Sequence, residues 1–282
     1  MSLKQRLVPY WLLAPGLLWL VVFFVVPMYF MGELALRSGS LTSGYTFDWA
    51  WSNFPDSLSG HTEQIIRSFF YAGTATLLAL LIAYPLAYAI AFKSGRLRNI
   101  LLVLVVAPFF VSFLLRTVAW KQILADNGWV ADILRFLHIL SEDGRIINTA
   151  LAVVIGITYN FLPFMILPIY ASLERVDPRL MEAAGDLYAN GLTTLRKVTF
   201  PLSLPGVVAG TLLTFIPAAG DYVNSALLGD PVHTTMVGNV IDSRFLRVVD
   251  YPTAAVLSVT LMVSILVLVA VYIRRAGTEE LV

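Results

Sequence analysis

The sequence contains no cysteine, and only 13% of its 282 residues are charged. Without cysteine the chain can form no disulfide, no thiolate nucleophile and no cysteine-ligated metal site. The charged fraction is about half of the roughly 25% that is usual in soluble domains. The formal net charge of +1 gives no reason to expect nucleic acid or an acidic macromolecule as a partner.

Signatures of catalysis and of cofactor binding are missing as well. No Gly-x-x-x-x-Gly-Lys-[Ser/Thr] segment occurs, so the chain has no P-loop for ATP phosphates. No Ser/His/Asp arrangement is visible, and the three histidines, His61, His138 and His233, lack the spacing of metal ligands. We therefore expect no enzyme activity, no metal and no cofactor on this chain.

Apolar side chains are what the sequence has in abundance. Hydrophobic residues make up 58% of the chain, and its mean hydropathy is +0.79. One globular core cannot hide so much apolar surface, whereas stretches of about 20 apolar residues can cross a bilayer. The sequence predicts an all-α, polytopic membrane protein, with 1–282 forming a single transmembrane domain of six helices near 11–32, 66–92, 99–120, 146–173, 205–224 and 253–273.

Lysine and arginine near the ends of these stretches predict their orientation, because cytoplasmic loops are enriched in both. With the N-terminus inside, eleven flank the cytoplasmic ends: Lys4, Arg6, Lys93, Arg96, Arg98, Arg175, Arg179, Arg196, Lys197, Arg274 and Arg275. Six flank the other ends: Arg37, Lys121, Arg135, Arg145, Arg244 and Arg247. This asymmetry predicts that both termini are cytoplasmic. Most acidic residues then fall outside, where they would attract a cation.

The longest inner connector, 174–205, carries helical signals. Asp177 can cap the start of a helix, and Pro178 suits its first turn. We expect Gly191 to end this helix in a left-handed conformation, and Pro201 to end a second short helix. A spacing of i, i+4 and i+7 predicts one apolar stripe on the first helix, at Leu180, Ala184 and Leu187.

The order of residues in this connector is also distinctive. Glu182-Ala183-Ala184 is followed by three residues, Tyr188, nine residues and Val198-Thr199-Phe200-Pro201. This resembles the EAA loop of ATP-binding-cassette importer permeases, which has Gly at the place of Tyr188, and Ile and Leu at those of Val198 and Phe200. The resemblance implies a coupling helix that docks in a cleft on the ATPase, through Glu182, Ala183, Ala184, Asp186, Leu187, Gly191 and Pro201.

Other runs resemble permeases of the spermidine/putrescine type: 9–16, 159–168, 219–223, 227–229 and 236–239. This resemblance implies a subunit in a bacterial inner membrane. Its implied partners are a second homologous permease subunit, an ATPase dimer, an external substrate-binding protein and lipid. Iron, sulfate and other permeases share parts of these runs, so another small solute is an alternative cargo. An ion-driven secondary transporter is the alternative from another class, although the repeated halves typical of it are not visible.

The fifth apolar stretch has the features expected of a route through the membrane. Gly206 and Gly210 are spaced to let two helices approach closely. Asp221 follows a proline and a glycine near membrane depth, where an ionisable group usually faces a pathway or a partner; the alternative is that it caps the end of the span. Arg116 is expected to extend to the outer interface. The candidate pathway residues are Asp221, Tyr222, Tyr159 and Asn160.

Overall fold

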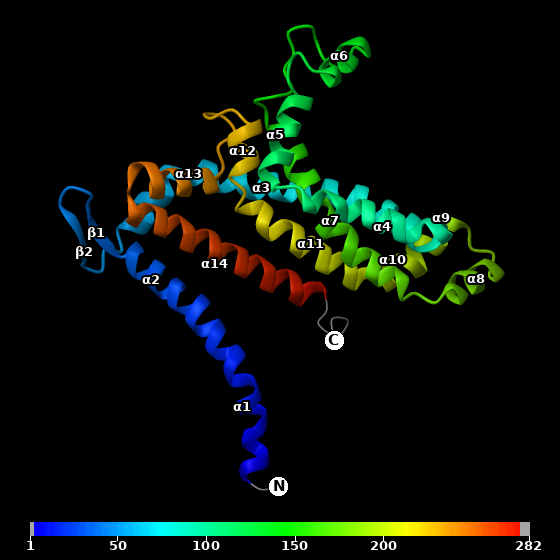
Figure 1. Ribbon diagram of the computed structural model, residues 1–282, viewed down its shortest axis with the longest axis horizontal. Helices are drawn as coiled ribbons and strands as arrows, with labels where there is room; N and C mark the ends of the chain where they lie inside the picture. The colour runs from blue at the N-terminus through cyan, green and yellow to red at the C-terminus, as the bar shows by residue number, and fades with distance from the viewer. Residues whose placement is uncertain (1–2, 277–282) are drawn as a thin grey trace. The chain divides into compact units, whose positions relative to one another are not determined.

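The computed structural model describes residues 3–276, with side chains from Leu12 to Arg275. This part of the chain is mostly helical, which confirms the predicted fold class (Figure 1). It divides into two compact units. The first runs to Thr62 and includes Val240–Val263, and the second comprises Glu63–Asn239 and the chain from Ser264 onward.

The first unit begins with a continuous helical segment. Helices α1 (Leu3–Leu20) and α2 (Val26–Ala35) are joined by a π-helical turn at Val21–Val25. All side chains between Leu12 and Val26 are exposed, and most of them are apolar. A helix that is apolar all round and exposed is suited to lipid or to another protein rather than to water.

A β-hairpin follows α2, in a segment where the sequence predicts only a connector. Strands β1 (Arg37–Ser40) and β2 (Gly44–Phe47) pair antiparallel, with Arg37 opposite Phe47. The Asn53 amide holds the base of the hairpin by donating to the carbonyl oxygens of Ala35, at 2.9 Å, and Arg37, at 2.8 Å. The Tyr45 hydroxyl donates to the Val249 carbonyl on the far side. These hydrogen bonds hold the hairpin in a defined position at the end of α2.

Two long helices pass from one unit into the other. Helix α3 (Asn53–Tyr88) begins earlier than the expected span 66–92 and is extended by a π-helical turn at Ala89–Lys93. A kink at His61, where φ is −132°, separates its polar start from its apolar remainder. Helix α13 (Val237–Ser243) and a π-helical turn at Arg244–Val248 lead to the second long helix, α14 (Tyr251–Ala276).

The second unit is built around two helices that lie side by side, α7 (Ala150–Glu174) and α11 (Leu204–Ala219) (Figure 1). A Cβ added at Gly206 would lie 2.5 Å from the Pro168 carbonyl oxygen, and one at Gly210 would lie 3.0 Å from that of Met165. Only glycine allows backbones this close. The close helix approach predicted from the two glycines is therefore confirmed.

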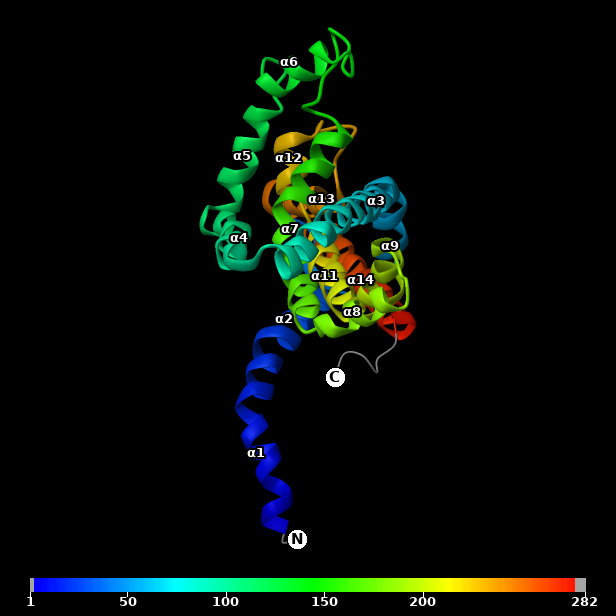
Figure 2. The ribbon, with the colours of Figure 1, turned by 90° about the vertical axis from the view of Figure 1, so that its right-hand side faces the viewer.

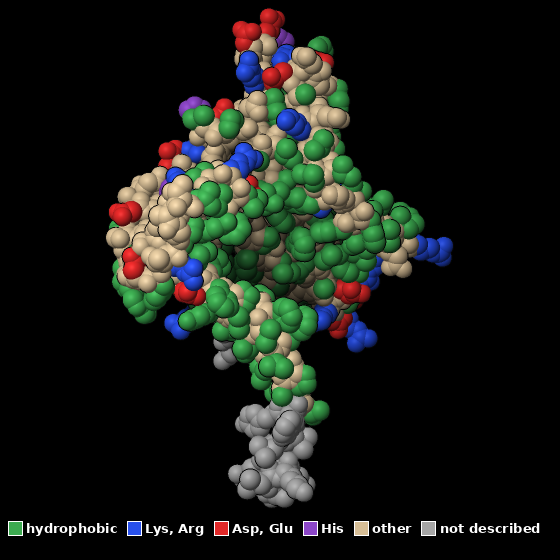
Figure 3. All heavy atoms as spheres, turned by 60° about the vertical axis from the view of Figure 1, so that its left-hand side comes forward, with side chains coloured by type: hydrophobic (Ala, Val, Ile, Leu, Met, Phe, Trp, Pro, Cys, Tyr) green, Lys and Arg blue, Asp and Glu red, His purple; other side chains and the backbone are tan. Residues whose placement is uncertain are grey.

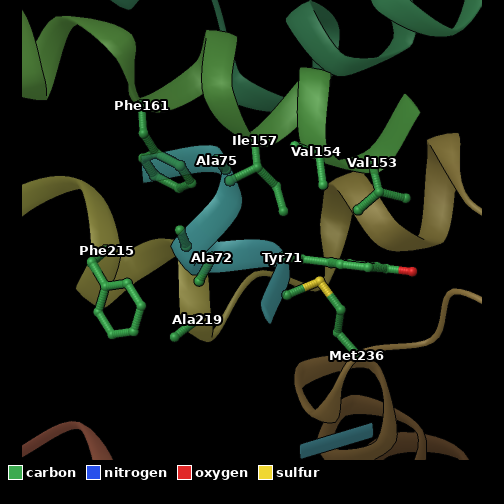
Figure 4. Packing of buried hydrophobic residues seen from close by; sticks show 11 residues of the cluster. Tyr71, Ala72, Ala75, Val153, Val154, Ile157, Phe161, Phe215, Ala219 and Met236 are labelled. Carbon is green, nitrogen blue, oxygen red and sulfur yellow. The ribbon is translucent and has the colours of Figure 1, made fainter. Parts of the chain in front are cut away.

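The core of this unit joins α3, α7 and α11 (Figure 4). Val153, Val154, Ile157 and Phe161 of α7 face Tyr71 and the small side chains of α3, with Met236 below them. Alanines at 72 and 75 are fully buried, so α3 packs close to its neighbours. Small residues at such contacts favour helix association within a membrane.

The third predicted span, 99–120, is broken by a bend that the sequence analysis did not predict. Helix α4 (Arg98–Val106) continues through a 3₁₀ turn at Ala107–Phe110, and α5 (Phe113–Ile123) then departs at 96°. Pro108 lacks an N–H, and Val111, with φ −97° and ψ 137°, leaves the helical conformation. Figure 2 shows α5 leading away from α4 to α6 (Trp129–Phe136). We call α5 and α6 the arm.

Short helices complete the second unit. They are α8 (Pro178–Asp186), α9 (Gly191–Thr194), α10 (Phe200–Leu202) and α12 (Val223–Leu228).

The described helices provide four to six membrane spans. Four segments are long and apolar enough by themselves: Leu12–Ala35, Asn53–Lys93, Ala150–Glu174 and Tyr251–Arg275. Two further spans result if each bent pair of helices is counted as one span. These pairs are Gly95–Phe110 with Phe113–Ile123, and Gly191–Leu202 with Leu204–Ala219, of which the second is bent by 68°. On the face seen in Figure 3, hydrophobic side chains gather in broad patches, and charged ones lie mostly outside them.

Candidate functional site

Helix α8 forms the first part of the candidate coupling loop. The Asp177 carboxylate accepts the N–H of Arg179 at 2.9 Å, and Pro178 is the first helical residue. Both features follow the sequence prediction. The predicted apolar stripe is wrong, because Ala184 is buried against its own chain while Leu187 lies beyond the helix and is 81% exposed. The remaining predicted coupling residues are exposed: Glu182, Ala183, Asp186, Leu187, Gly191 and Pro201.

The turn after α8 is made by a residue other than the expected glycine. Tyr188 has a left-handed backbone, with φ 57°, and the N–H of Ala189 closes the helix on the Ala184 carbonyl at 3.0 Å. Gly191 instead opens α9, where the Asn190 side chain accepts the N–H of Thr193 at 2.8 Å. Asn190 therefore acts as a cap for the next helix.

Pro201 does not end the second helical run. A π-helical turn at Leu195–Thr199 precedes it, and the run continues through α10 to Leu202 before the 68° bend into α11. Proline is tolerated in the first turn of a helix, where its missing N–H has no partner in any case. The bend at Ser203 thus joins the candidate coupling loop directly to α11.

The tip of the loop exposes large apolar side chains. The Tyr188 ring is 99% exposed, Leu187 81% and Leu192 73%. Together with Glu182, Ala183 and Asp186 they form a surface that this chain leaves uncovered. Such a surface, apolar at its centre and charged beside it, fits docking to another protein.

At the base of the loop, a cluster that the sequence did not predict fastens α4 to α7. The Arg98 guanidinium donates to the Tyr170 hydroxyl, pairs with Glu174 and lies over the Tyr170 ring, 5.0 Å from its centroid. Glu174 is the last residue of α7, directly before the loop. A movement of the loop therefore acts on both helices at once.

Of the candidate pathway residues, Asp221 and Asn160 belong to one buried network. The Asp221 carboxylate accepts the Asn224 N–H at 2.9 Å and the Asn224 side-chain amide at 3.0 Å. The Asn160 amide donates to Asn224 Oδ1 at 3.0 Å and to Thr117 Oγ1 at 3.1 Å. Three helices, α5, α7 and α12, are thereby fastened together. Asn224 and Thr117 carry no motif that would have singled them out.

The placement of Asp221 agrees with the capping alternative. Helix α11 ends at Ala219, and Asp221 lies beyond it, where its side chain is 7% exposed and bonds to the first turn of α12. Within this chain the carboxylate lies beneath the surface rather than in a pathway.

The two aromatic candidates lie in different surroundings. The Tyr222 ring is 47% exposed next to the buried Asp221. Tyr159 packs edge-on against Trp120, with the ring centroids 5.2 Å apart, and lines an otherwise apolar hollow of about 280 Å³ between α3, α4 and α7. Of the two tyrosines, Tyr222 is therefore the one whose ring is exposed and next in sequence to a carboxylate.

Beyond α12 a second carboxylate is fixed in its charged form. Asp230 is exposed and accepts the N–H groups of Val232, at 2.8 Å, and His233, at 2.7 Å. These bonds hold the pKa of the Asp230 carboxyl below its usual range. A negative charge therefore persists near the end of α12 at neutral and mildly acidic pH.

Arg116 does not extend outward as expected. Its side chain is only 8% exposed and lies over the rings of Phe109 and Phe113, at 5.3 and 5.7 Å from their centroids. The bend between α4 and α5 brings these rings beneath it.

Comparison with known proteins assigns the family. Residues 75–276 match the family described as the binding-protein-dependent transport system inner membrane component. The chain belongs to this family. It is a multi-pass permease subunit of an inner-membrane ATP-binding-cassette transporter, as the sequence predicted, and a non-catalytic membrane component of that system.

Two relatives are similar over almost their whole length. The spermidine/putrescine transport system permease protein PotB of Haemophilus influenzae is 37% identical over 257 residues, which cover 91% of this chain and 90% of the relative. PotB of Escherichia coli K12 is 34% identical over 259 residues, covering 92% and 94%. These relatives are of the spermidine/putrescine type, the same type of permease that the short runs in the sequence resemble.

Solved structures of other importers share its fold. A chain of the bacterial alginate transporter, crystallised with an alginate pentasaccharide-bound periplasmic protein, superposes with a TM-score of 0.68 at 18% identity, covering 98% of this permease and 96% of that chain. The MetNI methionine transporter gives 0.53 at 17% identity, covering 78% and 94%. At these identities the likeness establishes the fold alone.

Proposed function

We propose that this permease forms half of the translocation pathway of an importer for linear polycations of the spermidine/putrescine class. The observation that carries the proposal is the 34–37% identity to PotB proteins over nine-tenths of both chains. Proteins this similar over full length usually keep the chemistry of their cargo, whereas the fold alone would not specify it.

The surroundings of Tyr222 support a cationic cargo. An exposed aromatic ring attracts a cation by about 0.5–2 kcal/mol, and the carboxylate of the neighbouring, buried Asp221 adds negative potential. Asp230 supplies a further fixed charge near the end of α12. Weak contacts of this kind suit transport, because they concentrate a cation without trapping it. Asn160 positions Asp221 indirectly through Asn224, and Tyr159 contributes an aromatic wall from α7.

The proposed assembly contains four kinds of chain. A second homologous permease completes the pathway, two ATPase subunits bind ATP and Mg²⁺, and an external binding protein delivers the cargo. The exposed residues of α8 and its turn dock on the ATPase: Glu182, Ala183, Asp186, Leu187 and Tyr188. Ala184 supports this surface from within, and Gly191 and Pro201 shape the return to α11.

The test is uptake by the complete complex in liposomes, with labelled spermidine, putrescine and an uncharged solute. We expect uptake of the polyamines only, driven by internal ATP and unaffected by collapse of ion gradients. Tyr222→Leu should lower uptake about tenfold with basal ATPase activity unchanged, as loss of about 1.4 kcal/mol of cation attraction predicts. Tyr29→Leu, which removes an exposed ring from α2, is the matched control.

Three outcomes would contradict the proposal. Uptake that follows an ion gradient without ATP would favour a secondary transporter, and uptake of the uncharged solute alone would favour another cargo. Parental uptake by Tyr222→Leu would remove the ring from the route. Asp221→Asn adds a separate measurement: because the carboxylate also caps α12, its effect on uptake counts only if the protein melts at the parental temperature.

A further inference from the structure

Arg116 carries a positive charge that the described chain does not pair. Its Nε and Nη1 atoms are enclosed, yet neither has a hydrogen-bond partner. None of the ion pairs among residues with described side chains includes it. The guanidinium lies over the rings of Phe109 and Phe113.

A buried arginine in this state lacks both a counter-charge and hydrogen-bond acceptors. Its guanidinium stays protonated under all physiological conditions, so the group cannot neutralise itself. Buried charges in proteins are paired and hydrogen-bonded, because removing an ion from water is costly. Attraction to two aromatic rings offsets only part of that cost and satisfies no N–H donor. A partner acceptor from outside the described residues is therefore expected.

Among the residues with described side chains, Asp221 and Asp126 have partners other than Arg116. The Asp221 carboxylate accepts two N–H groups of Asn224, and Asp126 pairs with Arg145 at 3.8 Å. The proposed cargo is excluded as well, because a polycation would be repelled by Arg116. No acid with a described side chain pairs with Arg116, so the acceptor that suits it is an anion of another molecule, other than the cargo.

The arm that carries Arg116 also presents an uncovered apolar surface. On α6, Trp129, Ile133, Phe136 and Leu137 recur at i, i+4, i+7 and i+8, and they are 63%, 48%, 82% and 55% exposed. The opposite face of the same helix is packed, with Ala131 fully enclosed in a core shared with Leu124 and Leu228. One face of α6 thus packs against the core of this chain, and the other face is exposed and can bind a partner.

We propose that the arm is the surface on which the companion permease subunit packs, and that a carboxylate of that subunit pairs with Arg116. A lipid phosphate is the competing anion. An arginine that faces lipid extends its side chain toward the headgroups, whereas the Arg116 guanidinium is folded down onto Phe109 and Phe113. A rigid side chain of a packed subunit suits this enclosed position better. The inference rests on the proposed pairing of two permease subunits.

The first test measures assembly of the full complex from membranes with a tagged companion subunit. Arg116→Met keeps an unbranched, flexible side chain, although a shorter one, and removes the charge, so the companion's carboxylate would be left buried and unpaired. We expect recovery of Arg116→Met with the companion to fall at least tenfold, through faster dissociation. Arg145→Met, which removes a 73% exposed side-chain charge from the same unit, should be recovered like the parental chain.

The second part of the test identifies the partner residue by removing its charge as well. In the Arg116→Met background, the companion's Asp and Glu residues are changed singly to Asn and Gln. One of these changes should restore recovery, because both members of the pair are then neutral. Restoration by none of them would overturn the carboxylate pairing and favour a lipid phosphate.

A cysteine-free chain allows an independent test that does not depend on Arg116 variants. Phe136→Cys and Thr42→Cys are both exposed and each provide a single site for a benzophenone maleimide. We expect a photoproduct with the companion from Phe136→Cys and none from Thr42→Cys, which lies in the hairpin rather than on the arm. Lipid adducts alone from Phe136→Cys would overturn the docking surface. If the parental chain itself recovers no companion subunit, the proposed pairing of two permease subunits is wrong. This outcome differs from one in which the subunits pair but the companion does not dock on the arm.

Discussion

At the scale of single residues, Tyr188 is the position where the motif and the backbone meet. Its φ of 57° lies in the left-handed region, which favours glycine and strains an aromatic residue. The EAA pattern has glycine at this place, so the departure retains the turn at an energetic cost. In return, the loop tip carries a fully exposed ring.

We expect Tyr188→Gly to stabilise the turn after α8 by about 1 kcal/mol, because glycine lacks the Cβ that is penalised there. Hydrogen exchange of the α8 amides in the purified permease should slow about fivefold, the factor that corresponds to this energy. Gly191→Ala is the control: a Cβ at that position meets no atom within 4 Å and the backbone is helical, so exchange should stay parental. Faster exchange in Tyr188→Gly would show that ring contacts outweigh backbone strain.

At the scale of elements, the coupling loop shows what periodicity can and cannot predict. The cap at Asp177 and the start at Pro178 depend on neighbouring residues, and the sequence predicted both. The direction of Ala184 depends on packing against the rest of the chain, which periodicity does not contain. For the same reason the network of Thr117, Asn160 and Asn224 was missed, since its members come together from three separate helices.

Proline shows the same limit. Pro163 and Pro168 lie within α7, and Pro217 lies within α11, without breaking either helix. Pro108 precedes a 96° bend because the residues after its 3₁₀ turn adopt extended backbone. The residue type alone does not distinguish the two cases, so the bend in the third span was not predicted.

The exposed tip of the loop leads to a prediction about coupling. Leu187→Asp places a charge on a surface proposed to pack against the ATPase, and a charge without a partner there is unfavourable. We expect transport to fall at least tenfold while basal ATPase activity continues, measured together in proteoliposomes of the complex. Ile139→Asp, an equally exposed position in a different connector, should transport at the parental rate. Normal transport by Leu187→Asp would exclude this tip as the docking surface. Ala184→Arg is a poorer test, because it disturbs the chain's own packing.

At the scale of the whole molecule, composition predicted most of the architecture. Apolar length predicted the helices that can cross a membrane. The glycine spacing predicted that α11 approaches another helix closely, and the structure shows that this helix is α7. The hairpin between α2 and α3 was not predicted, because it is held by Asn53 and Tyr45 bonds to distant carbonyl groups rather than by an alternating apolar pattern. The orientation of the termini remains a prediction from lysine and arginine.

That orientation can be tested with single cysteines in the cysteine-free chain. Thr42→Cys, in the exposed turn of the hairpin, should react in intact spheroplasts with a maleimide that cannot cross membranes. Asn190→Cys, between α8 and α9, should react only after the membrane is opened. The reason is the excess of basic residues predicted on the cytoplasmic side. Labelling of Asn190→Cys in intact spheroplasts would reverse the topology and remove the coupling assignment.

The 96° bend leaves the third span with a short straight portion. Gly95–Phe110 reaches roughly 24 Å at 1.5 Å per residue, less than the ~30 Å of bilayer hydrocarbon. Lipid beside a helix that is too short must thin locally, at a cost that grows with acyl-chain length. We therefore expect the bilayer to thin beside α4, and membranes with shorter acyl chains to favour this conformation of the permease.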